Sequence, residues 1–229
     1  MRLILFDVDG TLITARGAGR RALRRALQGV FGTSGALDGY EMSGKTDPRI
    51  LFDLMEGAGL DRAAVKERLD EYFEIYARAL SDEIGDGRDV VTLPGVADLV
   101  RRLAATEDVV LGLLTGNIEE GARIKLAPTG LLPHFTLGAF GSDDPDRRRL
   151  PSLAARRAHA RLGYPFAPAE VLVIGDTPHD IDCARAFGAV AVAVATGRFS
   201  RAQLEAERPD LIFDHFADVE TAHRTLTAP

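Results

Sequence analysis

The sequence has one cysteine, no tryptophan and only three lysines among its 229 residues. A single cysteine excludes an intrachain disulfide, which is typical of proteins in a reducing compartment. No apolar run approaches the roughly 20 residues that span a bilayer, and the short N-terminal run meets Asp7 too soon for a signal peptide. We therefore expect a cytoplasmic protein with no membrane partner.

Aromatic residues make up only 7% of the chain, so its core must depend on leucine, valine, isoleucine and alanine. The hydrophobic content of 46% is enough for one large core, or for a core and a small second domain. The net charge of −6 argues against nucleic acid as the main partner. These numbers leave a monomer and a homodimer both open.

An apolar run over residues 3–6 ends in Asp7 and Asp9, which are followed by Gly10 and Thr11. The run predicts a short buried parallel strand, and ligands of open α/β sheets bind at the ends of such strands. If the extended geometry persists to residue 9, strand alternation points both carboxylates the same way. Because converging carboxylates repel each other unless a cation compensates, this pair predicts a Mg²⁺ site.

Two later strands end in polar side chains of the same kind. The apolar run 109–114 leads into Thr115–Asn117, and the run 171–174 leads into Asp176 and Asp180. If these strands are parallel neighbours of the first, their ends converge on one cleft. That cleft then holds four carboxylates, a hydroxyl and an amide.

Between the first strand and the later ones, about 70 residues carry helical patterns and no convincing strand. Alternating strands and helices elsewhere predict an α/β fold with a mostly parallel sheet covered on both faces. We therefore expect a core made of residues 1–14 and 89–229, and a helical subdomain, residues 15–88, inserted after the first strand. The helical stretches are 20–31, 48 to 57 or 59, and 63–80, and we expect Asp47 to be the N-cap of the second one.

Four motifs occur in an order that resembles the haloacid dehalogenase superfamily of phosphohydrolases. They are D-x-D-G-T at residues 7–11, a strand-end threonine at Thr115, a basic residue before a helix, and G-D-T-x-x-D at residues 175–180. Residues 44–47 and 94–96 are similar to the phosphoglycolate phosphatase and β-phosphoglucomutase-like branch. The resemblance implies a Rossmann-like three-layer α/β/α core with a helical C1 cap.

The resemblance also implies roles for the carboxylates. Asp7 would be the nucleophile that forms an aspartyl-phosphate, with Mg²⁺ bridging it to the phosphate. Asp9 would serve as general acid and then general base, and its backbone carbonyl would be a metal ligand. Asp176 would bind the metal directly, whereas Asp180 would hold the metal's waters or the basic residue.

Thr115 and the backbone N–H groups of Asp9, Gly10 and Gly116 would bind phosphate oxygens. Lys45 is a candidate for substrate contact, although surface charge near a helix start explains it equally well. The implied substrate-binding set is Gly10, Thr11, Lys45, Gly116, Asn117 and Arg148.

The third motif departs from the family, because the usual residue is lysine and no lysine follows Lys125. One residue of the run Arg147–Arg149 must replace it. If Pro151 begins the next helix, as in the usual motif, Arg148 takes the lysine's place. The pattern Gly-Ser-Asp-x-x-x-Arg-x-x-Leu instead selects Arg147, which we favour. Arginine keeps the charge and adds bidentate phosphate geometry.

We therefore expect a Mg²⁺-dependent phosphatase that acts on small phosphorylated metabolites such as phosphoglycolate. A phosphomutase of the β-phosphoglucomutase type would use the same residues. A 2-haloacid dehalogenase is a weaker alternative, because Asp9 has no role when the leaving group needs no proton. An inactive binding protein is supported only by the missing lysine.

Overall fold

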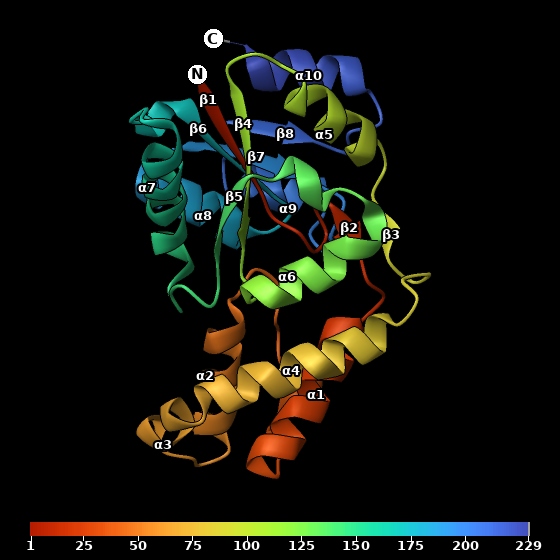
Figure 1. Cartoon of the computed structure of the whole chain (residues 1–229), viewed down its shortest axis with the longest axis vertical. Helices are drawn as coiled ribbons and strands as arrows, with labels where there is room; N and C mark the ends of the chain where they lie inside the picture. The colour runs from red at the N-terminus through yellow and green to blue at the C-terminus, as the bar shows by residue number, and fades with distance from the viewer. Residues whose placement is uncertain (229) are drawn as a thin grey trace.

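The computed structural model describes residues 1–228 and has a six-stranded parallel sheet in the order β5-β4-β1-β6-β7-β8 (Figure 1). The expected parallel sheet is therefore confirmed. β1, the first strand of the chain, lies near the middle of the sheet, between β4 and β6. The strands are β1 Arg2–Phe6, β4 Val109–Thr115, β5 Leu137–Phe140, β6 Val171–Gly175, β7 Val190–Val194 and β8 Leu211–Phe213.

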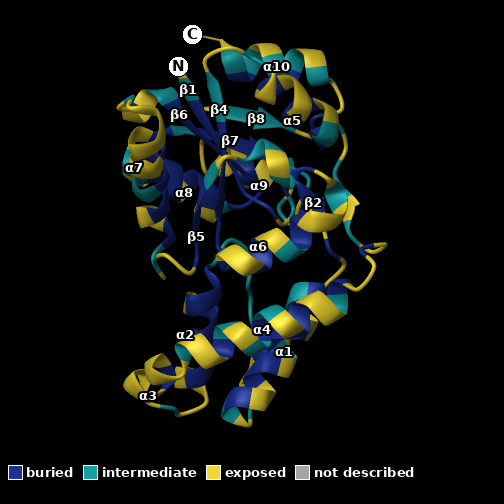
Figure 2. Ribbon diagram, viewed as in Figure 1, coloured by how far each residue is buried: buried dark blue, intermediate teal, exposed yellow. Residues whose placement is uncertain are grey.

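Helices cover both faces of the sheet. They must, because successive apolar side chains of β1 point to opposite faces and all of them are buried. Ile4 and Phe6 join one buried cluster with the side chains of α5 and α10. Leu3 and Leu5 join a second cluster with those of α7, α8 and α9. Figure 2 shows buried strands beneath helices whose outer sides are exposed, so the three-layer core is confirmed. The helices are α5 Val96–Ala104, α6 Glu119–Leu126, α7 Leu150–Leu162, α8 Pro178–Phe187, α9 Arg201–Ala206 and α10 Val219–Thr227.

Four helices form a block beside the sheet and have a hydrophobic core of their own (Figure 1). The stretch 63–80 differs from expectation, because two helices meet there at Arg68. Its backbone has φ −104° and ψ 13°, and its guanidinium binds Glu71 at 2.9 Å and the Val30 carbonyl oxygen. The block consists of α1 Ala18–Phe31, α2 Asp47–Gly57, α3 Arg62–Glu67 and α4 Leu69–Ile84.

The chain leaves the sheet for this helical block through β2 (Ile13–Thr14) and returns through β3 (Val91–Thr92). The two strands pair antiparallel, a small ribbon that the sequence patterns did not predict. Short 3-10 helices complete the described chain. They span Leu37–Gly39, Ala127–Thr129, Leu132–His134, Arg147–Arg149 and Pro168–Glu170.

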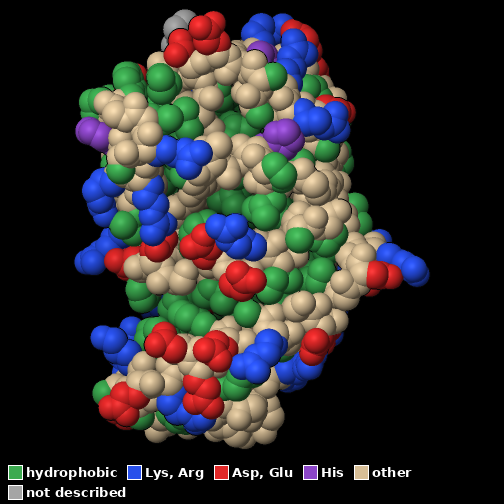
Figure 3. All heavy atoms as spheres, in the orientation of Figure 1, with side chains coloured by type: hydrophobic (Ala, Val, Ile, Leu, Met, Phe, Trp, Pro, Cys, Tyr) green, Lys and Arg blue, Asp and Glu red, His purple; other side chains and the backbone are tan. Residues whose placement is uncertain are grey.

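Charged side chains of both signs are interspersed on the face drawn in Figure 3, with no large area of one sign. Across residues 1–228, none of the helices is long and apolar enough to cross a membrane.

Candidate active site

The three strands that end in polar motifs are neighbours, because β1 lies between β4 and β6 and all three are parallel. Asp7, Thr115 and Asp176 therefore leave the sheet at the same edge. A cavity of about 540 Å³ opens there, between this edge of the sheet and the helical block. Of the residues expected at the site, its walls include Asp7, Asp9, Gly10, Lys45, Thr115, Gly116, Asn117, Arg147 and Asp176.

Three buried aspartates form a compact cluster at the bottom of this edge. One carboxylate oxygen from each of Asp7, Asp176 and Asp180 lies within 4.8 Å of the other two. The Thr11 hydroxyl donates to Asp176 at 3.1 Å. The backbone N–H and hydroxyl of Thr177 donate to one oxygen of Asp180 at 3.0 and 2.7 Å. Asp180 is thus fixed by its own helix, while Asp7 faces the cavity.

Electrostatics in the cluster favour a bound cation. Burial, reinforced by the charges of Asp180 and Asp9, raises the pKa of Asp7 to about 6 although Arg147 opposes the shift. Burial and the charge of Asp7 likewise raise the pKa of Asp176 well above its usual range. Several carboxylates share one buried arginine, so added positive charge would stabilise their ionised forms.

The residues present fit a hard divalent cation such as Mg²⁺, which prefers carboxylate oxygens. Two glycines allow the backbone to pass close to the Asp176 carboxylate. A Cβ on Gly197 would lie 1.7 Å from a carboxylate oxygen of Asp176, and one on Gly10 would lie 2.4 Å away. The backbone of both loops therefore approaches this carboxylate as closely as glycine allows.

Arg147 is the only member of the arginine run that reaches the cluster. Its Nη2 lies 3.0 Å from Asp7 and 2.5 Å from Asp180, and its side chain is 7% exposed. Burial lowers the pKa of this guanidinium, but the charges of Asp180 and Asp7 outweigh burial and raise it overall. Arg148 and Arg149 instead lie at the surface, where they pair with neighbouring aspartates of their own loop.

Part of the Arg147 side chain borders the cavity. Its Nε is buried and has no hydrogen-bond partner among residues 1–228. Its Nη1 lies on the cavity wall next to Gly116, where a Cβ would come within 3.0 Å of it. The same Cβ would be 2.1 Å from the Lys45 carbonyl oxygen, so only glycine fits at position 116.

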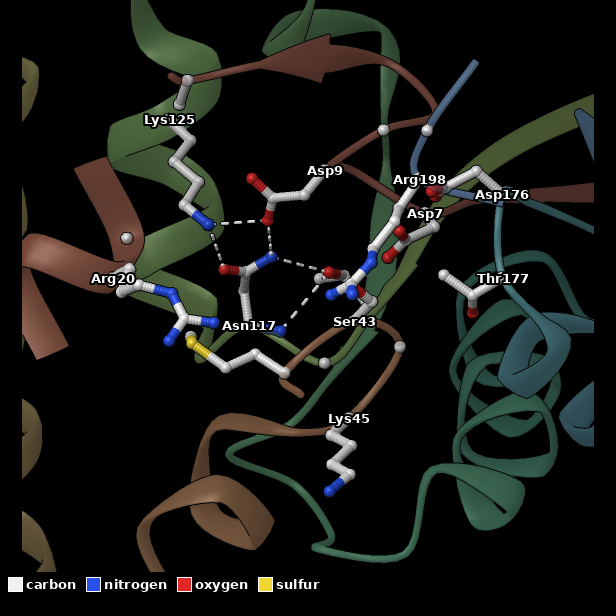
Figure 4. A pocket seen from close by; sticks show the side chains of 18 of the residues that line it. Asp7, Asp9, Arg20, Ser43, Lys45, Asn117, Lys125, Asp176, Thr177 and Arg198 are labelled. Atoms are coloured by element: carbon white, nitrogen blue, oxygen red, sulfur yellow. Dashed lines mark hydrogen bonds and ion pairs between the residues drawn. The ribbon is translucent and has the colours of Figure 1, made fainter. Parts of the chain in front are cut away.

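Asp9 has different surroundings from Asp7, and its side chain is 45% exposed to the cavity. Its Oδ2 accepts hydrogen bonds from Lys125 at 2.6 Å and from the Asn117 amide at 2.8 Å (Figure 4). The amide also donates to Thr115 at 2.8 Å, and its carbonyl accepts from Lys125 at 2.6 Å. Asp9 thus lies outside the aspartate cluster, and its carboxylate does not join the candidate metal ligands.

Lys125 is a residue of the site that sequence reasoning missed. It lies on α6 in the buried stripe of that helix, together with Gly121, Ala122 and Leu126. A lysine in an otherwise small and apolar helix face is the signal that could have identified it, since buried lysines are almost always paired.

Two expected phosphate contacts have other partners. The Gly10 N–H donates to the Ile13 carbonyl at 2.8 Å, within a tight turn where Gly10 has φ +84°. The Thr11 hydroxyl is committed to Asp176. Thr115, in contrast, accepts hydrogen bonds from Asn117 and keeps its own hydroxyl hydrogen for a ligand.

The loop before α2 closes one side of the cavity. Thr46, and not Asp47, caps this helix, because its hydroxyl accepts the Arg49 N–H at 3.3 Å. The Asp47 carboxylate instead accepts the Ile118 N–H at 2.8 Å at the start of α6. Burial raises the pKa of Asp47 to about 6, although the charge of Lys125 opposes the shift.

Lys45, in the same loop, lines the cavity with only part of its side chain. Its ammonium points away from the aspartates in Figure 4. It lies 2.8 Å from the Tyr40 hydroxyl and 3.6 Å from the Asp53 carboxylate. Contact between Lys45 and a substrate therefore stays a prediction.

Comparison with known proteins identifies the family of this chain. A family model described as haloacid dehalogenase-like hydrolase matches residues 4–185. A phosphoglycolate phosphatase from Synechococcus elongatus is 33% identical over 138 residues, which cover 60% of this chain and 62% of that protein. One from Mesorhizobium japonicum is 28% identical over 236 residues and covers 99% and 97%. The crystal structure of a hydrolase from Pseudomonas syringae superposes over 100% of both chains, with a TM-score of 0.71 and 22% identity. The chain therefore belongs to the haloacid dehalogenase-like hydrolase family.

Proposed function

We propose that this protein is a Mg²⁺-dependent phosphatase of small phosphomonoesters. The observation that carries the proposal is that Asp7 and Asp9 line one cavity in contrasting surroundings. Asp7 is buried against Arg147, whereas Asp9 is half exposed and held by Lys125. Two carboxylates with different environments suit one nucleophile and one proton-transfer group.

In the first step, a carboxylate oxygen of Asp7 attacks phosphorus and the bond from phosphorus to the ester oxygen breaks. Asp9 gives its proton to the departing alkoxide, so an alcohol leaves and an aspartyl-phosphate remains. Arg147 and the Thr115 hydroxyl donate to the phosphoryl oxygens as charge builds on them.

In the second step, the Asp9 carboxylate removes a proton from water, and the resulting hydroxide attacks phosphorus. The bond between phosphorus and the Asp7 oxygen breaks, which releases inorganic phosphate, restores the Asp7 carboxylate and leaves Asp9 protonated as it was at the start. Asp7 and Asp176 are the residues that would hold Mg²⁺, with Asp180 holding Arg147 in place. The bound ion would supply Lewis-acid stabilisation of the phosphoryl charge.

We further propose that residues 15–88 act as a cap over a catalytic core made of residues 1–14 and 89–229. Contacts across the cavity support a closed arrangement. Asp47 N–H donates to the Gly116 carbonyl at 2.7 Å, and the Thr46 hydroxyl donates to the Pro145 carbonyl at 2.8 Å. A cap that opens would admit substrate and exclude bulk water when it closes.

Phosphoglycolate is the first substrate to test, because relatives with that activity in their names align with this chain. The cavity of about 540 Å³ suits a metabolite of this kind or a somewhat larger one. A protein or nucleic acid substrate would not fit inside it.

The test is release of inorganic phosphate from a panel of metabolite monophosphates, with Mg²⁺ present or removed by chelation. We expect Mg²⁺-dependent release that Asp7→Asn lowers by at least ~10³-fold, since the covalent step is lost. Asp98→Asn, which makes the same change at an exposed carboxylate of α5, is a matched control. Isomerisation of a sugar 1-phosphate without net phosphate release would indicate a mutase. Turnover of chloroacetate would indicate a dehalogenase, and inactivity on every substrate would favour a binding protein.

A further inference from the structure

We propose that Lys125 is a positioning residue that orients the Asp9 carboxylate for proton transfer. This inference rests on the proposed phosphatase function. The Lys125 ammonium lies 2.6 Å from Oδ2 of Asp9, and its side chain is 5% exposed. Figure 4 shows the ammonium pointing from α6 toward Asp9 and Asn117 at the side of the cavity.

The arrangement distinguishes the two oxygens of Asp9. Both donors, the Lys125 ammonium and the Asn117 amide, bind Oδ2. Oδ1 receives no hydrogen bond from residues 1–228, and the carboxylate is half exposed to the cavity. Oδ1 is therefore the oxygen left to carry a proton to the leaving group and to take one from water. Without the two donors, these hydrogen bonds would no longer fix the rotation of the carboxylate about the Cβ–Cγ bond of Asp9.

Lys125 also determines how Asn117 is oriented. An ammonium has donors and no acceptor, so the amide must turn its carbonyl oxygen toward Lys125. This contact measures 2.6 Å. The amide nitrogen is then directed at Asp9 and at the Thr115 hydroxyl, both at 2.8 Å. One buried lysine thus aligns the proton-transfer group and, through Asn117, a phosphate-binding hydroxyl.

The surroundings accommodate a lysine at this place. A Cβ on Gly19, in the first turn of α1, would lie 3.5 Å from the ammonium and 3.8 Å from the Tyr76 hydroxyl. Both residues come from the helical block, so the block covers Lys125 while its charge stays paired with Asp9. Desolvating an ammonium is costly unless it is paired in this way. A lysine that served only solubility would not be buried here.

The experiment uses the leaving group to separate positioning from structural support. Lys125→Met removes the donors and keeps most of the volume. With an alkyl phosphate such as phosphoglycolate, the alkoxide needs a proton from Asp9. With p-nitrophenyl phosphate, the departing phenolate is stable without one. Because kcat/KM includes only the steps up to formation of the aspartyl-phosphate, its ratio for the two substrates reports proton donation.

We expect Lys125→Met to lower kcat/KM by about 10²-fold for the alkyl phosphate, in the range of general acid catalysis, and by less than about tenfold for p-nitrophenyl phosphate. Lys125→Arg, which keeps a cationic donor, should recover part of the alkyl rate. Lys66→Met, at an exposed lysine of α3, should match wild type on both substrates.

An equal loss on both substrates, or no loss on either, would overturn the inference. If Lys125→Met does not fold, Lys125→Leu is measured by the same ratio, because it also removes the donors. A wild-type enzyme that hydrolyses neither substrate would overturn the proposed function itself. Wild-type activity on both with an unchanged ratio in the variant would reject only the role of Lys125.

Discussion

Replacement of Arg147 is the sharpest test of how this site departs from its family. Arg147→Ala removes a buried cation that contacts both Asp7 and Asp180, at 3.0 and 2.5 Å. The neighbouring Arg148→Ala removes the same charge from a side chain that is 59% exposed and pairs with Asp146. The two variants therefore change the net charge equally and differ only in location.

The expected losses of stability and of kcat differ greatly between the two variants. Breaking a buried ion pair by removing one partner costs about 3–5 kcal/mol, whereas an exposed pair contributes about 0–1 kcal/mol. Loss of one preorganised donor to a developing oxyanion costs about 10²–10³ in kcat. We therefore expect Arg147→Ala to lose stability and at least about 10² in kcat, while Arg148→Ala stays near wild type.

The assay combines phosphate release with urea unfolding, both at saturating Mg²⁺ and at a temperature where each variant is folded. Arg147→Lys should recover much of the rate, because lysine keeps the charge but not the planar fork. If Arg147→Ala keeps more than about a tenth of the wild-type kcat, the assignment of Arg147 as a phosphate-binding residue is wrong. A tenfold loss corresponds to only about 1.4 kcal/mol of transition-state stabilisation. A larger loss in Arg148→Ala than in Arg147→Ala would refute the reasoning as well.

Two further predictions concern Asp47 and Gly197. Burial raises the pKa of Asp47 from 3.8 to about 6, so the folded state binds this proton more tightly than the unfolded state. The free energy of unfolding should therefore fall by about 3 kcal/mol as the pH rises from the unfolded pKa to the folded one. Asp47→Asn keeps an acceptor for the Ile118 N–H and should lose this part of the pH dependence. Urea unfolding of the variant and the wild type at pH 4 and pH 7 measures the difference, and an unchanged pH dependence in the variant would contradict the prediction. Gly197→Ala brings a Cβ to 1.7 Å from Asp176 and should weaken Mg²⁺ binding at least about tenfold, seen as a smaller rise in Tm on adding Mg²⁺. Gly57→Ala, where a Cβ meets nothing within 4 Å, should keep the wild-type rise, and equal rises in both variants would contradict the prediction.

Sequence patterns predicted the sheet and the cluster of motifs because both depend on residues close together in the chain. An apolar run followed by Asp7 and Asp9 identifies a strand and its end without knowledge of the neighbours. The same holds for the strand that ends at Thr115 and for the one that leads into Asp176. Parallel strands all present their carboxyl ends at one edge, so three local patterns imply one cleft once the strands are adjacent.

The sequence allows two registers for the arginine run, because the position of Pro151 selects Arg148 and the pattern Gly-Ser-Asp-x-x-x-Arg-x-x-Leu favours Arg147. In the structure, Arg147–Arg149 form a single turn of 3-10 helix. With three residues per turn, successive side chains point about 120° apart, so only one of the three can face the cleft. That geometry selects Arg147 and leaves Arg148 and Arg149 at the surface.

By itself, the sequence predicted the fold class and the family, and predicted that Asp7, Asp9 and Asp176 border one cleft. Only the tertiary structure decided which arginine contacts Asp7 and Asp180, that the Gly10 N–H is already bonded, and that Lys125 holds Asp9. The physical reason is distance along the chain. Lys125 and Asp9 are 116 residues apart, and their contact exists only because α6 and the end of β1 border the same cavity.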